Sequence, residues 1–167
     1  MIIVLMGPAG AGKSTIGVAL AGRLRWRLLD ADDLHSAANV DKMARGIALD
    51  DADRASWLDR VNGAMRQAEA DGVDLVVACS ALRERYRSVL VQHVPDVRWV
   101  FLRASRALLQ ERLAARPGHF AGPSLLDSQL AALEPPLDAV DIDASLSVAA
   151  IVEAICRALH LPCAAPR

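Results

Sequence analysis

The chain has 167 residues, of which 53% are hydrophobic and 23% are charged, and its formal net charge is −1. This length fits one domain with a core of its own, and the composition excludes a disordered or collagen-like chain. The balanced charge provides no overall field that would attract nucleic acid or an anionic membrane, so we expect neither as a partner.

Short apolar runs alternate with longer amphipathic stretches along the chain. The apolar runs predict buried strands at Ile2–Met6, Leu28–Asp30, Val73–Cys79, Val97–Leu102 and Val140–Asp143. The amphipathic stretches predict helices at Lys13–Leu24, Arg83–Gln92, Ser105–Arg116, Leu125–Leu133 and Ser147–Leu159. A further helix is expected to begin at an Asp51 or Asp53 cap and to end at Gly72, and Asp41–Arg45 predicts one or two helical turns.

This alternation predicts a single α/β domain over residues 1–167, with a five-stranded parallel sheet flanked by helices in three layers. The alternative, an α+β fold with antiparallel strands, is disfavoured because no two apolar runs are joined by a hairpin turn. Residues 117–123 are rich in glycine and proline and predict a loop. We expect a mobile lid at about 116–125 and a frayed tail at about 161–167.

The cysteines and the apolar segments indicate the cellular compartment of the protein. Cys79, Cys156 and Cys163 form no CxxC pair and are odd in number, which argues against a disulfide framework and for a reducing compartment. The longest apolar stretches fall well short of the ~18 residues of a membrane span. The apolar start of the chain leads into a glycine turn and lacks the pattern of a signal peptide. We therefore expect a cytoplasmic protein.

A phosphate-binding motif joins the first predicted strand to the first predicted helix. Residues 7–14 match the pattern G-x-x-x-x-G-K-[ST]. Its glycines let backbone N–H groups point at phosphate oxygens, and the following helix adds its positive end. Lys13 can reach the β- and γ-phosphates, and the Ser14 hydroxyl can ligate Mg²⁺. A P-loop NTPase fold follows, with nucleotide held by Gly7, Pro8, Ala9, Gly10, Ala11, Gly12, Lys13, Ser14 and the adjacent Thr15.

Acidic residues follow the second predicted strand at Asp30, Asp32 and Asp33. The carboxyl ends of neighbouring parallel strands line one crevice, so these carboxylates can face the bound phosphates. We expect Asp30 to join Ser14 in holding Mg²⁺, and Asp32 to accept the proton of an acceptor hydroxyl. The alternative role for these acids is a helix cap or a solvated turn, which we assign to Asp33.

Two arginines precede the glycine- and proline-rich loop. Arg112 and Arg116 are four residues apart and so lie on one helix face. In a small kinase, a flap with arginines closes over the γ-phosphate and excludes water. We expect Arg116 to act on the transferring phosphoryl group and Arg112 to stack on the adenine. The alternative is that both are ordinary surface arginines.

Several further motifs accompany the P-loop. Residues 30–35 resemble the pattern D-G-D-x-x-H, with Ala31 at the glycine. The other matching residues are Asn39, Lys42, Met43, Gly46, Leu49, Asp51, Asp53, Arg54, Trp57, Cys79, Ser80, Ala81, Leu82, Tyr86, Arg87, Gly118, His119, Phe120, Ser128, Gln129, Leu133 and Glu134. Together they resemble the gluconokinases of the thermoresistant type, a nucleoside-monophosphate-kinase-like group of P-loop kinases. The resemblance extends from about Ile3 to Val152.

The chain departs from that family at four further positions. Ser36, Ala48 and Ser56 stand where the family has proline, which changes the rigidity of loops rather than chemistry. Arg83 stands where the family has lysine, which keeps the positive charge but alters its reach and geometry.

The resemblance implies that ATP phosphorylates D-gluconate on its terminal 6-hydroxyl, giving 6-phospho-D-gluconate and ADP, in a homodimeric enzyme. Arg54 offers a bidentate fork for the gluconate carboxylate. The polar partners expected for the rest of the substrate are Asp32, His35, Lys42, Arg83, His119 and Gln129. Trp57 and Tyr86 are expected to be structural.

Other functions fit the motifs less well. A shikimate kinase would use the same loop, acids and arginines, but it would carry a glycine triplet where this chain has Cys79, Ser80 and Ala81. A nucleic-acid end kinase needs a basic groove with stacking aromatics, whereas aromatic residues make up 4% of this chain. A regulatory ATPase needs switch segments that the sequence does not show.

Overall fold

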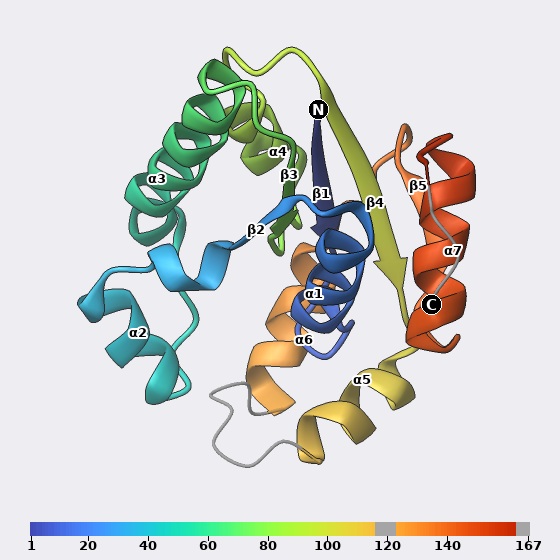
Figure 1. The fold of residues 1–167 in the computed structure, drawn as a ribbon. Helices are drawn as coiled ribbons and strands as arrows, with labels where there is room; N and C mark the ends of the chain where they lie inside the picture. The colour runs from blue at the N-terminus through green and yellow to red at the C-terminus, as the bar shows by residue number, and fades with distance from the viewer. Residues whose placement is uncertain (116–122, 163–167) are drawn as a thin grey trace.

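The computed structural model describes residues 1–115 and 123–162. Its centre is a five-stranded sheet in the order β2-β3-β1-β4-β5, with every neighbouring pair parallel (Figure 1). The strands are β1 (Ile2–Met6), β2 (Arg27–Asp30), β3 (Leu75–Ala78), β4 (Val97–Arg103) and β5 (Val140–Asp143). The predicted α/β fold with a parallel sheet is confirmed, and the antiparallel alternative is wrong.

Helices cover both faces of this sheet. They are α1 (Lys13–Leu24), the 3₁₀ turn η1 (Ala31–Leu34), α2 (Ala37–Ala44), α3 (Asp51–Ala70), α4 (Glu84–Leu90), α5 (Arg106–Ala114), α6 (Pro123–Ala132) and α7 (Val148–Ala158). Side chains alternate across β1, so Val4 packs with α3 and α4 on one face while Leu5 packs with α1 and α7 on the other. Two cores, one on each face, therefore hold the central strand in place.

Two helices differ from the prediction at their N-termini. α2 begins at Ala37, four residues before the predicted turns, because the Ser36 hydroxyl accepts a hydrogen bond from Asn39 N–H. The cap of α3 is Asp50, and not Asp51 or Asp53 as predicted. Asp50 accepts from the N–H of Asp53, and the Asp53 carboxylate accepts in return from the N–H of Asp50, which completes a capping box.

The structure describes one cysteine as disulfide-bonded and one as free. Cys156 in α7 is disulfide-bonded, whereas Cys79 is a free, buried thiol whose pKa is raised by burial to about 12. The cysteines therefore give no support to a reducing compartment. None of the helices in the described part of the chain combines the length and the apolarity needed to cross a bilayer.

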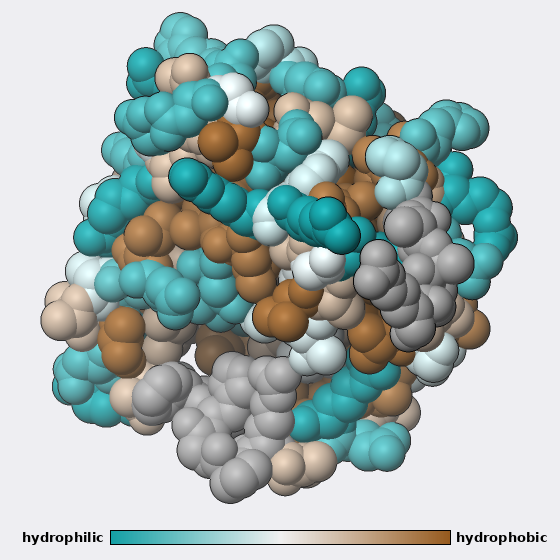
Figure 2. Space-filling view, in the orientation of Figure 1, coloured by the Kyte–Doolittle hydropathy of each residue, from teal (hydrophilic) through white to brown (hydrophobic). Residues whose placement is uncertain are grey.

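The sheet brings several chain segments to its carboxyl edge. The P-loop leaves β1 there, and residues 79–83 leave β3 beside it, with Gly7 N–H donating to Ser80 O at 3.3 Å. The turn η1 follows β2 at the same edge and lies against the first turns of α3. In the orientation of Figure 1, the molecular surface carries both hydrophobic and hydrophilic residues (Figure 2).

Candidate active site

The P-loop has the backbone form needed to surround a phosphate. Gly10 and Gly12 have φ values of +84° and +96°, in the left-handed region that favours glycine. At Gly10 a Cβ atom would also lie 3.0 Å from the carbonyl oxygen of Leu109. Gly12 is the N-cap of α1 and brings no side-chain hydrogen bond. The first N–H groups of α1 therefore remain available to an anion.

Lys13 and Thr15 belong to the first turn of α1. The Lys13 ammonium donates to the carbonyl oxygen of Pro8 at 3.0 Å, among its other contacts, so the lysine lies along the loop that it was predicted to serve. Thr15 is exposed.

Ser14 and Asp30 meet as predicted for a metal site. The Ser14 hydroxyl donates to Asp30 Oδ2 at 2.5 Å, and Asp30 Oδ1 accepts from the N–H of Asp32 at 3.1 Å. Within residues 1–115 and 123–162, no three His, Cys, Asp or Glu side chains gather as a metal site. Mg²⁺ in phosphate-transfer sites needs only one or two protein oxygens, because waters and phosphates supply the rest. This pair of oxygen donors therefore fits Mg²⁺.

Asp32 lies on η1, where α3 holds the backbone. The Trp57 indole N–H donates to the carbonyl oxygen of Ala31 at 2.6 Å, so a side chain from α3 fixes the turn. His35 stacks on Trp57 with 4.5 Å between ring centroids, and its Nε2 lies 3.9 Å from Asp32 Oδ1. Burial lowers the pKa of His35, which the nearby Asp32 carboxylate opposes. Trp57 is buried, as predicted for a structural residue.

Lys42 forms an ion pair with Asp53. Its ammonium donates to both oxygens of Asp53, at 2.6 and 2.8 Å. This hydrogen bonding raises the pKa of Lys42 and lowers the pKa of Asp53. A substrate that used Lys42 would have to share it with Asp53.

Arg54 and Arg83 meet at one aromatic ring. The guanidinium carbon of Arg54 lies 5.6 Å from the Tyr86 ring centroid, and that of Arg83 lies 6.0 Å from it. Arg54 Nη1 also donates to the carbonyl oxygen of Leu49. Neither arginine forms an ion pair with a carboxylate of the described residues.

Two other predicted residues lie against the P-loop. Arg112 Nη1 donates to the carbonyl oxygens of Gly10 and Ala11, both at 3.4 Å, and its Nη2 donates to that of Ala144 at 2.7 Å. Gln129, predicted to contact gluconate, accepts from the N–H of Ala9 through Oε1 at 2.6 Å. Sequence reasoning missed this link because 120 residues separate the two positions.

Other predictions lie outside the described residues. These are Arg116, His119, most of the lid at 116–125 and the tail beyond residue 162.

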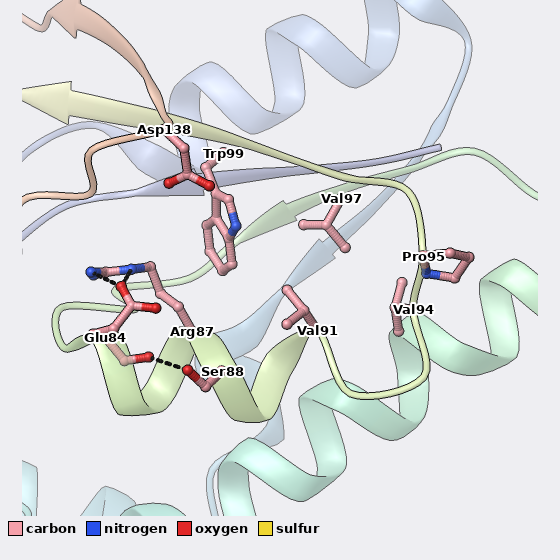
Figure 3. Close-up of a pocket in the computed structure, with 9 residues that line it drawn as sticks. All are labelled: Glu84, Arg87, Ser88, Val91, Val94, Pro95, Val97, Trp99 and Asp138. Atoms are coloured by element: carbon pink, nitrogen blue, oxygen red, sulfur yellow. Dashed lines mark hydrogen bonds and ion pairs between the residues drawn. The ribbon is translucent and has the colours of Figure 1, made fainter.

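A separate cavity of about 370 Å³ lies between α4 and β4, and none of the residues that line it is a predicted site residue (Figure 3). Its one cation, Arg87, is already held by Glu84 at 2.6 Å and by the carbonyl oxygens of Ala81 and Glu134. Val97, which lines the cavity, is the first residue of β4. The P-loop, in contrast, leaves the sheet at its carboxyl edge. We do not assign the cavity to nucleotide or acceptor.

A parallel sheet of this order, with a phosphate loop after β1 and acids after β2, defines a P-loop kinase. Residues 2–136 match the AAA_33 family, described as an AAA domain. A probable gluconokinase of Xenopus tropicalis is 41% identical, over 89% of this chain and 88% of that protein. The chain belongs to the gluconokinase family.

Two solved structures support the assignment to this family. The crystal structure of a gluconokinase from Sinorhizobium meliloti 1021 has a TM-score of 0.83 and 38% identity, covering 95% of this chain and 90% of that one. The unliganded structure of a sugar kinase from Janibacter sp. HTCC2649 has a TM-score of 0.89 and 35% identity, covering 96% and 95%. The predicted resemblance is thereby confirmed.

Proposed function

We propose that this protein transfers the γ-phosphoryl group of ATP to the terminal 6-hydroxyl of D-gluconate, giving 6-phospho-D-gluconate and ADP. The proposal rests on the groups that lie together at the carboxyl edge of the sheet. There the P-loop contacts Asp30 through Ser14, and Asp30 in turn accepts from the N–H of Asp32. Arg54 and Arg83, which form no ion pair with a carboxylate of the described residues, lie on the neighbouring segments. Gluconate supplies what this arrangement calls for, a hydroxyl to be phosphorylated and a distant carboxylate.

The nucleotide side of the site rests on the P-loop. Backbone N–H groups and Lys13 bind the phosphates, and Ser14 with Asp30 would hold Mg²⁺, which supplies charge neutralisation when bound. Arg116 is assigned to the transferring phosphoryl group. For Arg112 the observed contacts with the P-loop support an ordering role as well as the predicted stacking on adenine.

On the acceptor side, Asp32 orients the 6-hydroxyl and accepts its proton, while Arg54 and Arg83 bind the carboxylate. A primary alcohol is a poor nucleophile, so holding it in line with the phosphoryl group is most of the catalysis. His35, Lys42, His119 and Gln129 remain candidates for the other hydroxyls.

A coupled assay for ADP release tests the proposal against a panel of acceptors: gluconate, shikimate, nucleoside monophosphates and an uncharged polyol of the same length as gluconate. We expect turnover with gluconate and a kcat/KM roughly 10–100-fold lower with the neutral polyol, because a charge-assisted hydrogen bond contributes ~1.5–3 kcal/mol. Turnover of shikimate in place of gluconate would establish the alternative function.

We also propose that the 167 residues act as one kinase domain, in a cytoplasmic homodimer that uses ATP where the cell makes it. Both sheet faces carry their own core within this chain, which supports the single domain. Light scattering of the purified protein measures the assembly, and a monomeric mass at working concentration would contradict the dimer.

A further inference from the structure

We propose that Tyr86 is a positioning residue, which holds Arg54 and Arg83 as a joint site for the carboxylate of the acceptor. The inference rests on the proposed function, since it names the group that this enzyme recognises at the end of gluconate remote from the phosphorylated hydroxyl. Tyr86 comes from α4, Arg54 from α3, and Arg83 from the segment between β3 and α4.

The Tyr86 ring is the centre of a cationic cluster. The guanidinium carbons of Arg54, Arg83 and Arg85 lie 5.6, 6.0 and 5.5 Å from its centroid. The ring is 7% exposed, so its position is set by the core. An aromatic face attracts a guanidinium through its quadrupole and leaves the N–H groups at the edge of the guanidinium free to donate elsewhere.

Within the part of the chain that the structure describes, one carboxylate contacts this cluster, and it is already engaged. Asp51 accepts from the Tyr86 hydroxyl at 2.5 Å through Oδ1 and pairs with Arg85 at 2.5 Å through Oδ2. The hydrogen bond from Tyr86 is the main cause of the lowered pKa of Asp51, so this partner stays ionised. Arg85 therefore has an ion-pair partner. Arg54 and Arg83 form no ion pair with a carboxylate of the described residues, and Asp51 acts on them only as a nearby charge.

Arg54 and Arg83 are restrained before any ligand arrives. Arg54 donates to the carbonyl oxygen of Leu49, a buried residue, and both guanidiniums pack on a buried ring. Long side chains lose rotamer freedom when they bind, so restraint in the free protein reduces the cost of binding. Planar guanidiniums also match a carboxylate in geometry, which favours a carboxylate over a hydroxyl as the ligand.

The cluster lies at the acceptor side of the site. Residues 79–83 leave β3 beside the start of the P-loop, where Gly7 donates to Ser80 O. Arg54 lies in the first turns of α3, the helix whose Trp57 binds the turn that carries Asp32. An acceptor with its hydroxyl at Asp32 can thus extend toward α3 and α4.

The test is steady-state kinetics of Tyr86→Leu, with gluconate and the neutral polyol as acceptors. Loss of the ring should raise the KM for gluconate about tenfold. It should leave the KM for ATP and the kcat within about twofold, and it should reduce the preference for gluconate over the polyol. Tyr86→Phe, which keeps the ring, should restore most of the gluconate KM.

A double variant separates positioning from general loosening of the fold. If Tyr86 acts through Arg54, then Arg54→Ala combined with Tyr86→Leu should raise the gluconate KM little more than Arg54→Ala alone. Additive effects, or an unchanged KM in folded Tyr86→Leu, would overturn the inference.

Two neighbouring arginines provide a matched comparison that does not disturb the buried ring. Arg83→Gln should raise the gluconate KM about tenfold, whereas Arg85→Lys, which preserves the pair with Asp51, should change it less than about twofold. Equal effects of these two variants would overturn the inference even if Tyr86→Leu does not fold. Failure of the wild type to phosphorylate gluconate would instead reject the proposed function.

Discussion

Asp32 and Asp33 are adjacent acids with different assigned roles. Asp32 has a neighbouring imidazole, with His35 Nε2 at 3.9 Å, and its carboxylate remains 69% exposed and so accessible to an acceptor. The sequence predicts that Asp33 is a helix cap or part of a solvated turn. In the structure the cap of η1 is Asp30, which accepts from the N–H of Asp32, so the capping role belongs to Asp30.

This pair provides a direct test of the acceptor base. Asp32→Asn keeps the size of the side chain but removes its ability to take a proton, so kcat should fall by about 10²–10⁴ on every acceptor while ATP still binds. The adjacent Asp33→Asn is the matched control and should stay within about twofold of the wild type. Steady-state kinetics together with nucleotide titration measures both, and comparable losses in the two variants would contradict the assignment.

At the scale of elements, α6 contacts the P-loop through Gln129. Gln129 Oε1 accepts from the N–H of Ala9 at 2.6 Å, a backbone donor of the phosphate loop. α5 supports the same loop through Arg112, so two helices that flank residues 116–122 in the sequence both contact it. Nucleotide binding is therefore expected to depend on α6 even though α6 lies far from the motif in sequence.

Replacing Gln129 tests this dependence. Gln129→Glu places a carboxylate at the P-loop, and repulsion of the ATP phosphates should raise the dissociation constant of ATP about tenfold, less so at high salt. Gln129→Met is similar in length and uncharged, so its effect should be smaller and independent of salt. Fluorescence titration of the nucleotide at two ionic strengths distinguishes these results. A salt-independent loss in Gln129→Glu would contradict the explanation.

The start of α3 depends on Asp50. Its carboxylate accepts from Asp53 N–H at 2.8 Å, and the helix that it caps carries both Arg54 and Trp57. Asp50→Ala should lower the free energy of unfolding by about 1 kcal/mol, because a cap substitution typically costs about 0.5–2 kcal/mol. Asp59→Ala, an exposed change within the same helix, should have less effect. Denaturant unfolding measures both, and equal losses would argue against the cap.

The whole molecule should lose stability in two stages as the pH falls. Burial lowers the pKa of His35 from 6.5, so below about pH 6.5 the unfolded state binds a proton that the native state resists, and the unfolding free energy decreases. Hydrogen bonds lower the pKa values of Asp51 and Asp53 from 3.8. Their contributions are therefore present above that pH and are lost as the pH falls through the lowered values.

Denaturant unfolding across this range measures both stages. His35→Gln should remove most of the decrease between about pH 7 and about pH 5 and should leave the acidic stage in place. An unchanged slope in that variant over the first stage would show that His35 is not its cause.

Local sequence patterns determined the sheet, the P-loop and the family. Each of these depends on residues close together in the chain: the strand-length apolar runs, the glycines of residues 7–14, and the spaced motif at residues 30–35. Such patterns fix backbone conformation and hydrophobic periodicity within a few turns, and so they can be read without knowing how the elements pack. The caps of α2 at Ser36 and of α3 at Asp50 were missed because several neighbouring residues can cap a helix equally well in sequence.

Only the tertiary structure decided which charged and polar groups are already engaged. The sequence predicts both Lys42 and Arg54 as contacts for the substrate. In the fold Lys42 pairs with Asp53, whereas Arg54 forms no ion pair with any carboxylate that the structure describes. In the same way the fold brings Gln129 to Ala9 and gathers three arginines at Tyr86. These contacts join elements that are far apart in the chain, and the partner of a side chain is set by how those elements pack on the sheet.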